Sequence, residues 1–237
     1  DNRCLRTLLR EEHFDLIISD NRFGLRSPKV HCVYMTHQLY VQLPQRLRAL
    51  QPIAQAMHRF VYQRFHEIWV PDYASAEQSL SGTLSHGGSM DARVRYIGPL
   101  SRLEVPATPA PSPYEVVAVL SGLEPQRTLL EEEIIARFAH TQQWVLLVRG
   151  KMGEQMTRIR MGNIIIVPYI DDKSLICALL GAQRIIARSG YSTVMDLEYL
   201  GVLHKAEWHP TPEQPEQEYL AKRLIAKGYH PTVAIIG

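Results

Sequence analysis

The segment 185–201 (IIARSGYSTVMDLEYLG) has residue types and spacing that suit the binding of a nucleoside diphosphate. An apolar strand ending at Ala187 leads into a turn of small residues, and a helix is predicted to follow. The N-terminus of a helix presents unpaired backbone N–H groups and a partial positive charge, which attract phosphate. Gly190 would let the backbone approach closely, and the hydroxyls of Ser192 and Thr193 would add hydrogen-bond donors.

Three further residues complete this candidate nucleotide site. Arg188 and Ser189 form the tight turn with Gly190 and are included among the nucleotide-binding residues. Asp196 lies about one turn into the helix, where a carboxylate can accept hydrogen bonds from both hydroxyls of a ribose. The alternative is an ordinary strand-to-helix turn, in which the Ser and Thr hydroxyls only cap the helix.

The segment 116–127 (VVAVLSGLEPQR) has the same order of strand, small-residue turn and helix. Its turn is formed by Ser121 and Gly122, and Pro125 suits the first turn of the helix. Arg127 could reach a phosphate, or it could be a solvated surface charge. Alone, this pattern is weakly specific.

A proline-rich loop at 209–219 (HPTPEQPEQEY) presents several amides and carboxylates before another predicted helix. Glu213, Gln214, Glu216 and Gln217 are the groups in question. Such groups on a stiff loop suit the hydroxyls of a sugar. A polar helix start interrupted by prolines is the common alternative.

Two candidates for acid–base chemistry follow strands nearer the start of the chain. His37 lies in VYMTHQL (33–39), and Asp20 follows the apolar run before it. Ligands in open α/β sheets bind at the carboxyl ends of strands, so both residues would face a cleft. His37 could be a base or bind an acceptor or phosphate. Asp20 could be a base or position one, although turn capping explains it equally well.

The elements that would position these residues are strands alternating with helices. Short apolar runs rich in Val and Ile predict buried parallel strands at Phe14–Ser19, Val30–Met35, Glu67–Val70, Val94–Ile97, Val116–Leu120, Trp144–Val148, Ile164–Val167 and Arg184–Ala187. Helices are predicted at Leu43–Phe65, Leu129–Phe138, Asp172–Leu180, Thr193–Leu200 and Gln217–Lys227. This alternation predicts parallel sheets of the βαβ kind.

A proline-rich stretch at 98–115 separates the strands into two sets. Proline cannot continue a helix or a central strand, so this stretch is predicted to be a linker. We therefore predict an α/β protein of two Rossmann-like domains, at 1–103 and 114–237, joined by a linker at 104–113. Because the chain opens on a helical stretch without a Met, the N-terminal domain is expected to be incomplete.

The predicted helix at Leu43–Phe65 has apolar residues at spacings of three and four, which gives it one apolar face. Arginines lie opposite, at Arg46, Arg48, Arg59 and Arg64. A helix that packs on the core with a solvated basic face is the main expectation. Contact with an anionic membrane surface is the alternative. The segment 81–89 (SGTLSHGGS) is predicted to be a flexible surface loop.

Composition limits the classes of function. The chain has 237 residues and a formal net charge of +2, which gives no ground for a nucleic-acid partner. Its three cysteines are isolated, so we expect buried thiols in a cytoplasmic protein and neither a disulfide framework nor a zinc site. No run is long enough to span a bilayer. The adjacent Asp171 and Asp172 are predicted to cap a helix rather than to hold a metal ion.

Together these residues resemble the MurG-like glycosyltransferases, and in particular a bacterial branch of predicted glycosyltransferases. The shared pattern Arg-Ser-Gly-x-x-Thr-x-x-acid is present from Arg188 to Asp196, and a proline-rich loop ending in Gln217-Glu218-Tyr219 follows it. Thr36-His37-Gln38 resembles the family's His-Glu-Gln segment near the acceptor cleft. The turn SG-x-EPQR at 121–127 resembles the bacterial branch.

The resemblance implies the GT-B fold, with the donor bound to the C-terminal domain. It places Gly190, Ser192 and Thr193 against the diphosphate and Asp196 on the ribose. The same resemblance places Ser121 and Gly122 beside the phosphates. It places Gln217 and Glu218 in contact with the sugar.

The implied reaction transfers a hexosyl group, such as N-acetylglucosaminyl, from a UDP-sugar to an acceptor hydroxyl, without metal or cofactor. The acceptor is unknown, and a lipid-linked one would place the protein at the inner face of the plasma membrane. The family's N-terminal glycine-rich loop and closing C-terminal helix are absent from this sequence, and Glu218 replaces a second Gln. A degenerate nucleotide-sugar-binding subunit and a UDP-sugar epimerase of the same fold therefore stay open as alternatives. A dinucleotide-binding protein is disfavoured, because no GxGxxG follows a strand.

Overall fold

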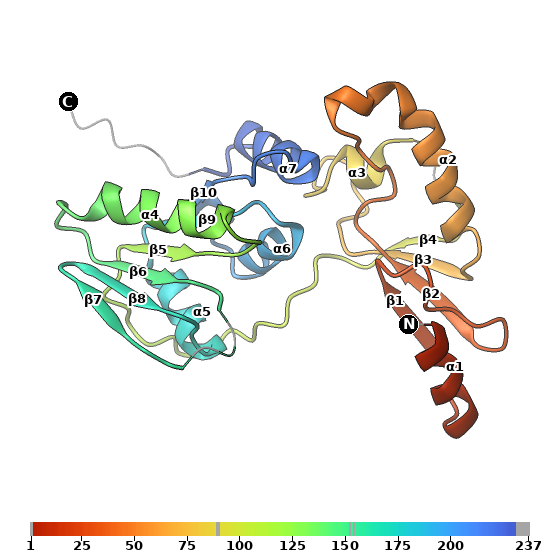
Figure 1. The fold of residues 1–237 in the computed structure, drawn as a ribbon, viewed down its shortest axis with the longest axis horizontal. Coiled ribbons are helices and arrows are strands. Elements are labelled where there is room, and N and C mark those ends of the chain that lie inside the picture. Colours follow the sequence, from red (N-terminus) through yellow and green to blue (C-terminus); the bar gives the residue numbers. More distant parts are fainter. Residues whose placement is uncertain (1, 89–90, 152, 154, 231–237) are drawn as a thin grey trace. The chain divides into compact units, whose positions relative to one another are not determined.

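The computed structural model describes residues 2–88, 91–151, 153 and 155–230. The chain divides into two units, Asp1–Leu100 and Ser101–Gly237, and each unit has its own sheet (Figure 1). Among the described residues, no helix has both the length and the apolar character needed to cross a membrane.

The first unit is built on four parallel strands in the order β1-β2-β3-β4. The strands are β1 (Leu16–Asp20), β2 (His31–Met35), β3 (Glu67–Val70) and β4 (Val94–Tyr96). Its helices are α1 (Asn2–Glu11), the 3-10 helix η1 (Gln45–Leu50), α2 (Gln51–Tyr62) and α3 (Thr83–His86). The core packs the aromatic rings of Tyr62 and Phe65 against Tyr34 and Ile68 of the sheet.

The second unit contains a sheet of six strands in the order β10-β9-β5-β6-β8-β7, in which only β7 is antiparallel to its neighbour. The strands are β5 (Val116–Val119), β6 (Val145–Val148), β7 (Ile159–Met161), β8 (Ile164–Val167), β9 (Arg184–Ala187) and β10 (Ala206–Trp208). The helices are α4 (Gln126–Phe138), α5 (Asp172–Gly181), α6 (Tyr191–Tyr199), the 3-10 helix η2 (Leu203–Lys205) and α7 (Pro215–Ala226). Figure 1 shows α4 and α5 on opposite faces of this sheet.

The core of the second unit explains why its strands read as continuous apolar runs. Val116, Ala118 and Leu120 point to the face on which Ile134 and Phe138 of α4 pack, and all five are at most 2% exposed. The intervening Val117 is equally buried. Because helices cover both faces, neither face of β5 needs polar residues.

The predicted strands are all present, and each end lies within two residues of its prediction. The predicted burial is wrong for β1, where Leu16 and Ile18 are 42% and 46% exposed. Two strands of three residues, β7 and β10, were missed. The predicted cap of α5 is confirmed, since the Asp171 side chain accepts a hydrogen bond from the backbone N–H of Ser174.

The prediction of a single helix over Leu43–Phe65 is wrong. The chain forms η1 and then α2, with Pro52 in the first turn of α2. A proline at this place has no N–H to donate, so it suits a helix start and does not continue the helix before it.

The packing predicted for this segment is also wrong. Tyr62 at the end of α2 packs into the core, but Gln55 faces the loop before η1: it accepts from the Val41 N–H at 3.1 Å and donates to the Leu39 carbonyl at 2.8 Å. His58 is buried against the same carbonyl. The loop before η1 needs partners for its backbone groups, and α2 supplies them. The apolar residues face outward instead, with exposed fractions of 47–67% at Leu47, Leu50, Ile53, Met57 and Phe60.

Two smaller expectations are corrected as well. The described part of 81–89 is no flexible surface loop: it contains α3, and Ser81 and Leu84 are fully buried. Asp72 explains the difference, because its buried carboxylate accepts hydrogen bonds from the hydroxyls of Ser79 and Ser81 and from the Leu80 N–H. The expectation of three buried thiols holds only for Cys32: Cys4 is exposed on α1, and Cys177 on α5 is partly exposed.

Candidate functional site

Three loops of the second unit meet at one edge of its sheet. Strands β5, β9 and β10 are parallel neighbours, and Ala187 pairs with both Val119 and Trp208. The three strands therefore end level with one another. The loops that follow them lead into α4, α6 and α7, and the carboxyl edge of a parallel sheet is where such folds bind ligands.

The turn between β9 and α6 is open above its glycine. Gly190 is the N-terminal flanking residue of α6, and a Cβ atom added to it would have no other atom within 4 Å. Its φ of −69° is one that any residue adopts, so backbone strain does not require glycine here. Ser192 is exposed and Thr193 half-buried in the first turn of the helix. An anion could therefore approach the first N–H groups of α6 directly.

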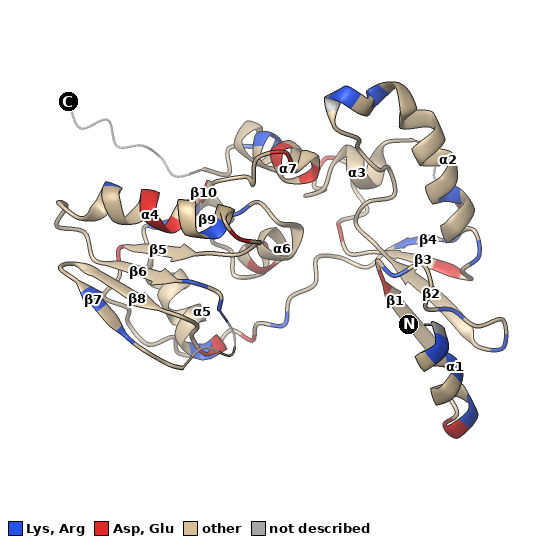
Figure 2. Ribbon diagram, in the orientation of Figure 1, with Lys and Arg blue, Asp and Glu red and all other residues tan. Residues whose placement is uncertain are grey.

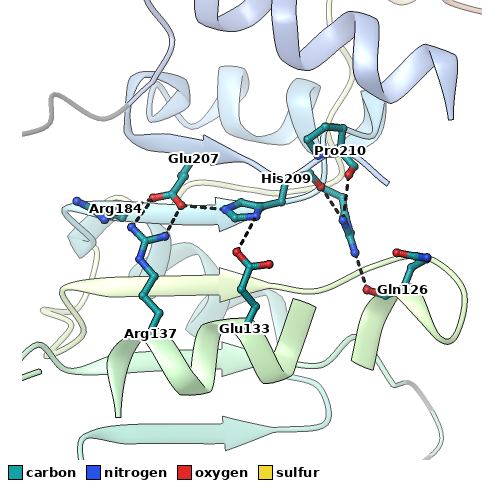
Figure 3. A network of polar contacts seen from close by, with 8 residues as sticks. Gln126, Glu133, Arg137, Arg184, Glu207, His209 and Pro210 are labelled. Carbon is teal, nitrogen blue, oxygen red and sulfur yellow. Dashed lines mark hydrogen bonds and ion pairs between the residues drawn. The ribbon is translucent and has the colours of Figure 1, made fainter. Parts of the chain in front are cut away.

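The Arg188 side chain links the three loops to one another. Its guanidinium is buried and donates to the carbonyls of His209 and Pro210, at 3.0 and 3.1 Å, and to that of Gln126 (Figure 3). Burial lowers the pKa of this guanidinium, and the charge of Glu133 opposes that effect. All of these partners are neutral carbonyls, so a positive charge stands beside the loops without a carboxylate in contact with it among the described residues.

A second polar network fixes the start of the loop after β10. Glu207 accepts from the ring of His209 at 2.8 Å and from the guanidinium of Arg137 on α4 (Figure 3). Burial alone would raise the pKa of Glu207, but the hydrogen bonds from His209 and Arg137 outweigh it and lower the pKa to about 2. The carboxylate therefore stays charged and ties β10 to α4.

Asp196, predicted to hold a ribose, already accepts a hydroxyl hydrogen bond. The donor is Ser101, at 2.6 Å, and the Ser101 oxygen in turn accepts from the Leu103 N–H at 3.1 Å. Burial raises the pKa of Asp196, while the Ser101 bond and the charge of Arg102 lower it. Sequence analysis missed Ser101, because 95 residues separate it from Asp196 and no pattern links them.

The loop after β10 uses its predicted sugar-binding amides internally. Gln217 accepts from the Thr211 N–H at 2.9 Å and donates to Gln214 at 2.6 Å. The backbone carbonyl of Gln217 accepts from the buried Ser189 hydroxyl at 2.7 Å, which joins this loop to the turn after β9. Glu218 accepts from the N–H of Glu213 at 3.1 Å. The amides are thus held in place, at the edge where the nucleotide site was predicted.

The turn between β5 and α4 is exposed at Ser121 and Gly122. Arg127 does not extend from it freely, because its guanidinium pairs with Glu124 at 2.7 Å. Hydrogen bonds from Thr128, and then from Arg127, lower the pKa of Glu124 to about 2. The Arg127 guanidinium, which was a candidate for reaching a phosphate, is therefore paired with the Glu124 carboxylate.

In the first unit, Asp20 ends β1 and is exposed, while His37 follows β2 and is half-buried. The strand register pairs Asp20 with Met35, two residues before His37. Both residues therefore lie at the carboxyl edge of the first sheet. The buried Thr36, directly before His37, donates its N–H to the Trp69 carbonyl at 3.0 Å. This bond fixes the path of the chain at this edge.

No protein-family model matches the chain, and no curated protein matches it significantly. Solved structures do match. The glycotransferase of kitacinnamycin is 14% identical with a TM-score of 0.63 and covers 97% of this chain. CalG4, the calicheamicin glycosyltransferase, is 13% identical with a TM-score of 0.58 and the same coverage. S. aureus MnaA, in a structure with UDP, is 10% identical with a TM-score of 0.50 and also covers 97%.

These likenesses show the fold class: two Rossmann-like domains, as in GT-B proteins. The chain spans 65% of the kitacinnamycin glycotransferase, 64% of CalG4 and 71% of MnaA. The predicted fold class is therefore confirmed.

Proposed function

We propose that the second unit binds the nucleotide of a UDP-sugar at the edge formed by the loops after β5, β9 and β10. The protein would then transfer a hexosyl group, such as N-acetylglucosaminyl, to an acceptor hydroxyl. The observation that carries the proposal is the open N-terminus of α6, one turn before a half-buried carboxylate that already accepts a hydroxyl. In a nucleoside diphosphate, the diphosphate needs N–H donors such as those of a helix N-terminus. The ribose attached to it offers hydroxyls from which a carboxylate can accept hydrogen bonds.

In this proposal the diphosphate lies over Gly190 and accepts from the α6 N–H groups and from the hydroxyls of Ser192 and Thr193. Asp196 accepts from the ribose. Arg188 acts through its charge and through the loops that it holds, since its guanidinium donates to the backbone carbonyls of His209, Pro210 and Gln126. The developing charge on the leaving diphosphate is the largest demand of the reaction, and fixed donors meet it best.

The sugar would lie between the loop after β10 and the turn after β5. Gln214, Gln217 and Glu218 would supply its hydrogen-bond partners, with Ser121 and Gly122 beside the phosphates. Because the two glutamines bond to each other and to the loop, their orientation is fixed before the sugar arrives.

The acceptor hydroxyl would attack the anomeric carbon as the bond to the diphosphate breaks, and its proton would pass to a base. His37 and Asp20, at the carboxyl edge of the first sheet, are the candidates for that base. No cofactor takes part in this scheme, and the helix terminus and hydroxyls replace a metal ion at the diphosphate.

The fold supports this proposal, because two of the similar structures are named as glycosyltransferases and a third was determined with UDP. Two alternatives share the same nucleotide site: a nucleotide-sugar-binding subunit without catalysis and an epimerase that acts on a UDP-sugar.

Calorimetric titration with UDP, UMP, GDP and TDP in the presence of a chelator tests the nucleotide site. UDP should bind at micromolar concentration, and Asp196→Ala should abolish the binding. Glu132→Ala, which changes an exposed carboxylate on α4, is the matched control and should bind as the wild type does. A folded protein that binds none of the four nucleotides would contradict the proposal. Product analysis with UDP-sugars then separates transfer, epimerisation and binding alone.

A second observation bears on the acceptor: η1 and α2 together expose an apolar stripe of Leu47, Leu50, Ile53, Met57 and Phe60. On α2, Gln55 faces the preceding loop, and His58 and Tyr62 are buried. No Asp or Glu occurs between residues 21 and 66. Figure 2 shows basic but no acidic residues on η1 and α2. Arg64 lies over the Phe60 ring, 4.2 Å from its centroid, so charge and apolar surface are contiguous.

We propose on this basis that η1 and α2 rest on an anionic membrane surface, where a lipid-linked acceptor would be available. An apolar stripe flanked by arginines has the chemistry that such surfaces bind. The proposed location is therefore cytoplasmic, at the inner face of the plasma membrane.

Sedimentation with vesicles tests this contact. The protein should bind vesicles that contain phosphatidylglycerol, release them at high salt, and ignore pure phosphatidylcholine. Met57→Asp should abolish binding, whereas Leu129→Asp, which changes an apolar residue of α4 that is 52% exposed, should not. Absence of vesicle binding together with a concentration-dependent dimer would assign the stripe to a second copy of the chain instead.

A further inference from the structure

Thr211 carries a buried hydroxyl to which the described residues give no hydrogen-bond partner. The residue is 5% exposed, and its Oγ1 atom makes no hydrogen bond within the part of the chain that the structure describes. A buried polar group without a partner costs about 1–3 kcal/mol, so natural proteins keep few of them. Such a group next to a candidate site suggests that a ligand supplies the missing partner.

The backbone around Thr211 is held on both sides. The Pro210 carbonyl accepts from Arg188 at 3.1 Å, and the Thr211 N–H donates to Gln217 at 2.9 Å. Prolines flank the residue, and the residue before a proline is restricted to extended conformations. The loop therefore cannot easily shift to give the hydroxyl another partner.

The Thr211 hydroxyl lies next to Gly122 of the turn after β5. Its Oγ1 atom would lie 3.9 Å from a Cβ atom placed on that glycine, which is ordinary van der Waals contact, and Gly122 is exposed. The φ of Gly122 is +94°, a conformation that favours glycine. The hydroxyl is therefore adjacent to an exposed turn without a side chain.

We propose that the Thr211 hydroxyl donates a hydrogen bond to the phosphate that carries the sugar of the bound donor. This inference rests on the proposed function. The position of Thr211 supports it, because the residue lies between the turn assigned to the phosphates and the amide of Gln217, assigned to the sugar. A phosphate oxygen is an acceptor without competing donors, and a hydroxyl bond to a charged acceptor is stronger than one to a neutral acceptor.

The proposal predicts opposite effects on stability and on binding. Thr211→Val has nearly the same shape but no hydroxyl. If the hydroxyl is unpaired in the free protein, the variant should melt at the same temperature as the wild type or higher. If it binds the distal phosphate, UDP affinity should fall about tenfold, as expected for the loss of one hydrogen bond to a charged group.

Calorimetry and thermal melting of the whole chain test this. Thr211→Val should weaken UDP binding but not UMP binding, because UMP lacks the distal phosphate. Thr211→Ser, which keeps the hydroxyl, should restore the wild-type affinity for UDP. These three results together are expected.

Other results would overturn the inference in distinguishable ways. A clear drop in the melting temperature of Thr211→Val would mean that the hydroxyl has a structural partner. Equal UDP affinity in the variant and the wild type would remove Thr211 from the site while leaving the proposed function intact. A wild-type protein that binds no nucleotide would overturn both.

Discussion

Replacing Glu207 by glutamine should destabilise the protein at neutral pH and have almost no effect in strong acid. The carboxylate joins β10 to α4 through His209, at 2.8 Å, and Arg137, and it lies 3.4 Å from Arg184. Its pKa is lowered from 4.5 to about 2. A group whose pKa is lowered by folding contributes stability above its unfolded pKa and loses it as the pH falls through the folded one.

The magnitude follows from these two pKa values. The difference between 4.5 and about 2, at 1.36 kcal/mol for each pKa unit, corresponds to about 3 kcal/mol at neutral pH. Glu207→Gln should therefore lower the free energy of unfolding by up to about 3 kcal/mol at pH 7, and by little at about pH 2. Urea unfolding followed by circular dichroism at both pH values measures this.

Glu132→Gln, on the exposed side of α4, is the control and should change stability at neither pH. An equal loss for Glu207→Gln at both pH values would show that packing, not charge, is what glutamine disturbs. No loss at neutral pH would refute the account of this network.

Three further changes test other parts of the structure. Gly122→Ala should lower stability by about 1–2 kcal/mol in thermal melting, because φ is +94° there, and retained stability would show that the turn can adopt another conformation. Phe138→Ala should cost about 3–5 kcal/mol in urea unfolding, since the ring is 2% exposed in the core under α4; a loss below about 1 kcal/mol would contradict that packing. Ser101→Ala should raise the pKa of Asp196 in an NMR titration, because burial would then act without the opposing hydrogen bond; an unchanged pKa would rule out that bond in solution.

The sequence predicted the central strands of the second sheet because a strand covered by helices on both faces is a continuous apolar run, as in Val116–Val119 and Ile164–Val167. It also predicted the start of α6, from the small residues after Ala187. A local sequence pattern was sufficient to predict an element where a whole strand is buried or where a turn is made of small residues.

Other features depend on contacts that no local pattern encodes. The apolar stripe of η1 and α2 has the spacing of a core helix, yet it is exposed, and the bonds from Gln55 to the preceding loop depend on contacts that this spacing does not encode. Arg188 was predicted as a nucleotide-binding residue from its place in the turn, but its carbonyl partners in two distant loops could not be predicted from the sequence. Thr211 gave no signal, since a buried hydroxyl is recognised only when its surroundings are known.

The central claim is that a nucleoside diphosphate binds at the N-terminus of α6. Amide NMR spectra of the isotope-labelled chain during titration with UDP test it most directly. The largest shifts should belong to Gly190, Ser192 and Thr193, with saturation at micromolar UDP and no dependence on added magnesium. Largest shifts at residues of the first unit, or no saturable shift at these three amides, would contradict the claim.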